Sequence, residues 1–113
     1  MAKRENKFQA ELIKRLKDEF PGCMILKNDP NYIQGIPDLT IFYKKHWAVL
    51  ECKRSMKEIL DPNAHQPNQD YYVELMDNMS FASFICPENM EEVIDELHRS
   101  FKTSRSTRIS RCK

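Results

Sequence analysis

The stretch that decides the fold is residues 35–53, which read GIPDLTIFYKKHWAVLECK. Its two apolar runs, 38–43 and 46–53, are separated by a pair of lysines, and this spacing predicts an antiparallel β-hairpin with a two-residue turn. The numbers of facing residues then have a constant sum, which gives the pairs Tyr43–His46, Phe42–Trp47, Thr40–Val49 and Asp38–Glu51. The sequence therefore predicts that two carboxylates face each other across neighbouring strands.

These opposed carboxylates need a counter-charge. Directly opposed side chains have Cβ atoms about 4.5–5.5 Å apart, and like charges there are destabilising. A divalent cation meets the need, because Mg²⁺ binds through one or two carboxylates together with substrate phosphate. Strand alternation places Lys53 on the face of Glu51 and Cys52 on the other face. The Lys53 ammonium would then lie beside the metal, where it could orient or activate water.

A second interpretation is that Glu51 and Lys53 form an ordinary ion pair on an exposed sheet. Val49 and Leu50 indicate instead a buried strand, where unpaired charge is costly. We therefore favour the metal site. The aromatic residues of this hairpin are expected to lie in the core and not to stack on bases, namely Phe42 and Trp47.

At these residues the chain resembles the PD-(D/E)XK nuclease superfamily. Pro37-Asp38 matches the PD half of its motif, Glu51-Cys52-Lys53 matches the (D/E)XK half, and Gly35 matches the G-x-P-D form of some members. The similarity is greatest to the small VRR-NUC-like and phage resolvase-like members, including Holliday junction resolvases. It extends over residues 5–97.

The resemblance implies a fold and a set of ligands. It implies an α/β, restriction-endonuclease-like core in which helices flank a mixed β-sheet, and Mg²⁺ as the cofactor, with Mn²⁺ able to replace it. Asp38, Glu51 and the backbone carbonyl of Cys52 would bind the metal, and Lys53 would be the catalytic lysine. Local patterns alone indicate only an α/β or α+β sandwich.

The coarse order of elements reads α-β-β-β-α-β-α. Apolar residues at helical spacing predict a first helix over 5–20, which Pro21-Gly22 ends. Residues 57–68 are polar and are expected to form a mobile loop near the substrate. The remaining elements are a strand over 23–27, the hairpin, a helix that Pro67 begins, a strand over 81–86 and a last helix that Pro87 begins.

Two positions on the predicted helices are candidates for the site, and each has a competitor. Glu5 falls near the middle of the apolar arc of the first helix and matches the helix glutamate of the family, although a first-turn acid also favours a helix N-terminus. Glu11 is its substitute. Gln69, at the start of the second helix, resembles the glutamine that many members place beside the active site, where it would bind substrate or hold a water. Gln66 is close enough to compete as a substrate contact.

Cationic residues surround the predicted centre. Lys27, Arg54 and Lys57 would contact a polyanionic substrate, although lysines at the ends of strands and loops are often only solvated. His65, in the polar loop, is a further candidate contact with nucleic acid.

Composition indicates one domain over residues 1–101, followed by a basic segment over 102–113. The net charge is +1, and this segment carries +5, which leaves the rest of the chain near −4. The segment is expected to be disordered when free, and either a solvated terminus or a phosphate-binding tail. The four cysteines lack CxxC spacing and are expected to be reduced packing residues. Without a membrane span or a signal-like segment, a cytoplasmic location is expected.

The sequence thus predicts a metal-dependent DNA endonuclease. The resemblance favours cleavage of branched or junction DNA, by a homodimer that makes two symmetric cuts. A restriction or repair-type nuclease acting on duplex or flap DNA is an alternative. A nucleic-acid-binding or protein-interaction module that keeps the fold without the chemistry is another, although such a module has no need for two opposed acids.

Overall fold

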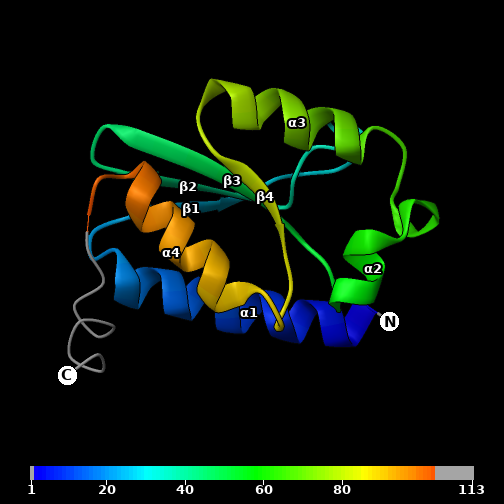
Figure 1. The fold of residues 1–113 in the computed structure, drawn as a ribbon, viewed down its shortest axis with the longest axis horizontal. Helices are drawn as coiled ribbons and strands as arrows, with labels where there is room; N and C mark the ends of the chain where they lie inside the picture. Colours follow the sequence, from blue (N-terminus) through cyan, green and yellow to red (C-terminus); the bar gives the residue numbers. More distant parts are fainter. Residues whose placement is uncertain (1, 104–113) are drawn as a thin grey trace.

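One four-stranded sheet lies between two helical layers in this computed structural model, which describes residues 2–103, with side chains from Lys7 onward. Helices α1 and α4 cover one face of the sheet and α3 covers the other (Figure 1). The elements are α1 (Ala2–Glu19), β1 (Met24–Lys27), β2 (Leu39–Tyr43), β3 (His46–Cys52), α2 (Met56–Leu60), the 3₁₀ turn η1 (Pro62–Ala64), α3 (Gln69–Met79), β4 (Ala82–Ile85) and α4 (Met90–Ser100).

The sheet has the order β1-β2-β3-β4 and is mixed, because β1, β2 and β3 run antiparallel while β3 and β4 run parallel. The predicted register of the hairpin is confirmed, from Tyr43 opposite His46 to Thr40 opposite Val49. Lys44 adopts the positive φ of 57° that suits a two-residue hairpin turn. None of the helices between residues 2 and 103 is long and apolar enough to cross a membrane.

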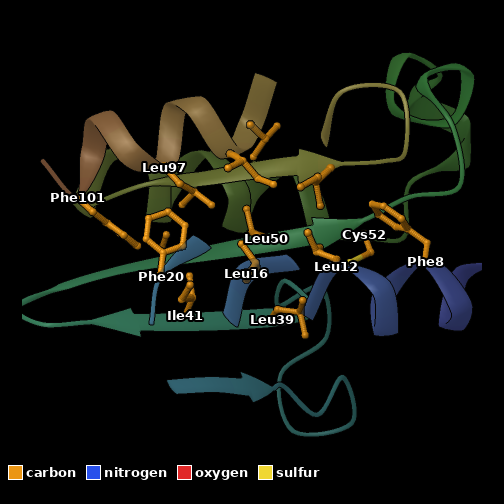
Figure 2. Packing of buried hydrophobic residues seen from close by; sticks show 14 residues of the cluster. Phe8, Leu12, Leu16, Phe20, Leu39, Ile41, Leu50, Cys52, Leu97 and Phe101 are labelled. Carbon is orange, nitrogen blue, oxygen red and sulfur yellow. The ribbon is translucent and has the colours of Figure 1, made fainter. Parts of the chain in front are cut away.

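The main hydrophobic core lies between the sheet and the α1/α4 layer (Figure 2). Leu12 and Leu16 of α1 and Phe20, which follows the helix directly, are fully buried in one cluster with residues such as Leu50 and Ile94. Burying each such side chain contributes roughly 1.5–3 kcal/mol relative to leaving it in water. This core fixes β3, the strand that carries Glu51, at the centre of the molecule.

The opposite face of the sheet is only partly covered. Val49 and Ala82 are buried there, because α3 packs on β3 and β4. The prediction that Phe42 belongs to the core is wrong, since its side chain is 41% exposed, and Trp47 is only half-buried. Both side chains lie on the face of the sheet that α3 covers. Helix α3 packs on β3 and β4 and leaves this part of the hairpin partly exposed.

The predicted order lacks two short elements. Residues 57–68 were expected to be a loop, but they include most of α2 and the turn η1. Helix α2 begins because the hydroxyl of Ser55 accepts a hydrogen bond from the backbone N–H of Glu58. Pro67 does not begin α3, since Asn68 is its N-cap residue and Gln69 its first residue.

The end of the described chain is attached to α4. The backbone N–H of Thr103 donates to the carbonyl of His98, and the Thr103 hydroxyl lies 2.5 Å from His98 Nδ1. Of the predicted basic segment, only Lys102 and Thr103 are described, and residues 104–113 lie outside the described residues. Cys23, Cys52 and Cys86 carry free thiols, as predicted, while Cys112 falls outside that range.

Candidate active site

Two charged side chains at the end of β3 lie on the face of the sheet that α3 covers. Glu51 is 3% exposed, and Lys53, which follows the strand, is 5% exposed. Cys52, between them, points to the opposite face and joins the main core. The burial of both charges excludes the interpretation of Glu51 and Lys53 as an exposed surface pair.

Asp38 lies directly before β2, one position beyond the pair Leu39–Leu50, so the register continues to Asp38 opposite Glu51. Its Oδ2 atom accepts a hydrogen bond from the backbone N–H of Cys52 at 2.9 Å. Burial raises the pKa of the Asp38 carboxyl, and the Cys52 hydrogen bond and the charge of Lys53 oppose this only in part. A cation near Asp38 would therefore relieve an unfavourable desolvation.

Asn28 fixes the backbone on both sides of Asp38. Its backbone N–H donates to the Asp38 carbonyl at 2.8 Å, and its amide nitrogen donates to the Pro37 carbonyl at 3.0 Å and to Thr40 Oγ1 at 2.8 Å. The sequence analysis treated Asn28 only as part of a turn. Its position directly after the predicted strand over 23–27 was the available signal, because asparagine side chains often hydrogen-bond nearby backbone.

Gln69 lies between the acid and the lysine. Its Nε2 atom donates to Glu51 Oε2 at 2.6 Å, and its Oε1 atom accepts from Lys53 Nζ at 2.9 Å and from the backbone N–H of Gln66 at 3.1 Å. Lys53 Nζ also lies 3.4 Å from the Ala64 carbonyl. The structure therefore brings Gln69 to the site by its side chain and Gln66 by its backbone.

These groups line an open cavity of about 450 Å³. Its walls include both acids, the lysine and the glutamine, with Pro30, Arg54, Glu58, Ala64 and Gln66. The walls suit Mg²⁺, since two desolvated carboxylates supply the oxygen ligands that hard cations prefer. Among the described residues no group of three acidic, histidine or cysteine side chains is arranged to hold a metal, so the Cys52 carbonyl remains the predicted third ligand.

The predicted nucleic-acid contacts occupy different environments. Arg54 lines the cavity, and Glu58 holds it through hydrogen bonds to its backbone N–H at 2.9 Å and to Nε at 2.7 Å. Lys27 and Lys57 are exposed at the end of β1 and in α2. The His65 ring is turned inward, with Nδ1 2.8 Å from Asp70 Oδ1, and it stacks on Phe84. This placement gives His65 a role in holding the segment between α2 and α3.

The helix carboxylate remains a prediction. Glu5 belongs to α1, but its side chain lies outside the described part of the chain. Phe8, three residues further along α1, belongs to the same buried cluster as Cys52 at the end of β3 (Figure 2). Glu11, the substitute, is exposed.

The sequence analysis missed Glu58 as well as Asn28. A signal for Glu58 was present, because Ser55-Met56-Lys57-Glu58 has the S-x-x-E spacing of a capping box. No model of a known protein family, no curated protein and no solved structure matches this chain.

Proposed function

We propose that this protein is a metal-dependent endonuclease that hydrolyses DNA phosphodiester bonds at a site of the PD-(D/E)XK kind. The observation that carries the proposal is the buried series Glu51–Gln69–Lys53, which opens into the same cavity as Asp38. Burying a carboxylate and an ammonium costs stability unless they are paired. Their arrangement at the wall of a polar cavity is therefore better explained by chemistry than by folding.

Asp38 and Glu51 would bind the metal, together with the Cys52 carbonyl and, if its side chain reaches the site, Glu5. A bound Mg²⁺ would polarise a phosphoryl oxygen and would favour the loss of a proton from a water molecule. The N–H of Cys52 orients the Asp38 carboxylate, and Gln69 orients that of Glu51. These hydrogen bonds fix the acids before substrate arrives, which is the preorganisation that electrostatic catalysis requires.

Lys53 would place a positive charge beside the reacting phosphate. Its ammonium has three protons, and Gln69 and the Ala64 carbonyl accept two of them. The remaining N–H can form a hydrogen bond that orients the attacking water, or one to an oxygen of the phosphate, where negative charge develops. Gln69 connects the two opposite charges, because its amide donates to Glu51 and accepts from Lys53.

The DNA structure that is cut follows only from the resemblance. It favours branched or junction DNA and a homodimer, and duplex or flap DNA is the alternative. Arg54, Lys57 and Lys27 would supply phosphate contacts around the cavity, with Gln66 at its wall.

The test is a cleavage assay with purified protein on junction, flap, duplex and single-stranded DNA, each with Mg²⁺ and with EDTA. We expect Mg²⁺-dependent cleavage of at least one substrate, and none by the Asp38→Asn variant. Cleavage that persists in EDTA, or in the Asp38→Asn variant, would show a contaminant or a different site. Failure to cut any of the substrates with Mg²⁺ or Mn²⁺ would overturn the proposal.

A further inference from the structure

A second cavity, of about 470 Å³, lies next to the proposed active site. Its walls are formed by Tyr32, Ile33 and Ile36 of the loop before β2, by Thr40 of β2 and by Met76 of α3. A concave apolar site with a few polar groups is the usual form of a ligand pocket. Neither the proposed metal chemistry nor the predicted phosphate contacts use these residues.

The two cavities are adjacent. Asp38 lines the first and Thr40 the second, and side chains two residues apart on an extended backbone share a face with Cα atoms about 6.6 Å apart. Asn28 also connects them, since it lines the second cavity and donates to both the Thr40 hydroxyl and the Asp38 carbonyl. A nucleotide whose phosphate lies at Asp38 therefore has its neighbouring groups within reach of this cavity.

The walls favour the uncharged part of a nucleotide. Asp29 supplies the one charged group among the described lining residues, and it is an acid, so a phosphate would be repelled. Tyr32 lines the cavity although its side chain is 85% exposed. Packing within the fold does not account for an aromatic ring so exposed, whereas a flat aromatic ligand would cover it.

We propose that this cavity receives an unpaired nucleobase of the DNA, stacked on Tyr32, next to the phosphate that is cut. The proposal rests on the proposed function and names its substrate class. A base within a duplex must be unpaired and unstacked before it enters such a pocket, and that cost is least where the base is already unpaired. The preferred substrates would then carry an unpaired nucleotide beside the cut, as in bulges, mismatches and flaps.

The test compares affinities without cleavage, in EDTA, for oligonucleotide duplexes that carry a single bulged nucleotide at successive positions. Each bulged nucleotide is either an ordinary base or an abasic residue. At one or more positions the wild type should bind the duplex with an ordinary base more tightly than the duplex with an abasic residue. The expected difference is roughly 5- to 150-fold, which is the affinity that one stacked base contributes. Tyr32→Ala should bind both forms equally, and Tyr32→Phe should retain most of the discrimination.

The matched control is Tyr71→Ala, which removes a tyrosine that is 60% exposed on α3 and does not line the cavity. It should discriminate as the wild type does. Equal wild-type affinity for base and abasic forms at every position, or full discrimination by Tyr32→Ala, would overturn the base pocket. Because these affinities are measured without catalysis, that result is distinct from the absence of cleavage that would overturn the nuclease proposal.

Discussion

Gly35 lies so close to Asn68 that a Cβ atom added to Gly35 would be 2.6 Å from Asn68 Cβ and 2.7 Å from the Pro67 carbonyl oxygen. The contact joins the loop that leads to Asp38 with the turn that begins α3 at Gln69. Both residues have left-handed backbone, with φ of 92° at Gly35 and 72° at Asn68. The two halves of the candidate site are therefore held together by a contact that only glycine permits.

Gly35→Ala should separate these halves. We expect a loss of stability above the ~1–2 kcal/mol that a left-handed alanine costs, because Pro67 and Asn68 must also move. Cleavage should fall strongly, since Gln69 would no longer align Glu51 with Lys53. Thermal melting and single-turnover cleavage measure the two effects.

The Gly22→Ala variant is a control for the effect of backbone strain alone. Gly22 has a similar φ of 90°, but within residues 2–103 no heavy atom beyond its chain neighbours lies within 4 Å of its added Cβ. It should lose stability from the strain alone and retain cleavage when measured well below its melting temperature. Equal losses of stability and activity in the two variants would show that the Gly35–Asn68 contact has no special role.

Asp38→Asn should abolish cleavage while leaving metal-free stability unchanged or raised. The substitution removes a desolvated charge opposite Glu51, and the amide oxygen can still accept from the Cys52 N–H. Millimolar Mg²⁺ or Mn²⁺ should raise the melting temperature of the wild type through linkage, and EDTA should reverse the rise. The metal-site hypothesis would be wrong if neither metal changed the melting temperature of the wild type and the Asp38→Asn variant were active.

Lys53→Ala should lower the single-turnover rate strongly and change DNA affinity little. The reason is that Lys53 is proposed to act on the attacking water and on developing charge, which are absent in the bound ground state. Lys53→Met, which keeps most of the buried stem, controls for packing, and Lys53→Arg should not restore full activity. Weaker binding with an unchanged single-turnover rate would make Lys53 a phosphate anchor instead.

The hairpin could be predicted from sequence because its register depends on local features. Two apolar runs around a two-residue turn leave one pairing that keeps Leu39, Ile41 and Leu50 in the core. The same alternation placed Glu51 and Lys53 on one face. Helix α2 was also within reach of local reasoning, through the Ser55–Glu58 spacing.

Other features depend on tertiary packing and gave no local signal. Gln69 contacts Lys53 although the two lie 16 positions apart in the sequence, and its place at the site was expected only from the resemblance. Phe42 was expected in the core because it is aromatic and lies in a strand, yet α3 covers a different part of the sheet. How far a helix extends over a sheet is set by packing between elements distant in sequence, which residue patterns do not encode.

Glu58 should make stability depend on pH. The backbone N–H of Arg54 is the main cause that lowers its pKa below the ordinary 4.5. A carboxyl with a lowered folded pKa contributes stability that is fully present above its unfolded pKa and is lost as pH falls through its folded pKa. Glu58→Gln should therefore reduce the melting temperature near neutral pH and lessen its decline on acidification below about 4.5.

The control for Glu58 is Glu74→Gln, which removes the same charge from an exposed position on α3. Its melting temperature should decline on acidification as steeply as that of the wild type. If the two variants give superimposable curves of melting temperature against pH, the Glu58–Arg54 contacts do not contribute to stability.

The basic C-terminal segment should supply part of the attraction to DNA. Truncation after Thr103 retains the contact between Thr103 and His98 and removes Arg105, Arg108, Arg111 and Lys113. Residues 1–103 carry a net charge near −3, so we expect weaker binding at low salt and a flatter salt dependence, by up to about 0.9 log units per lost phosphate contact. The cleavage rate at saturating DNA should be unchanged, because the proposed catalytic residues lie outside the segment. Equal affinities and equal salt slopes for the full and truncated chains would assign DNA binding to Lys27, Arg54 and Lys57 around the cavity.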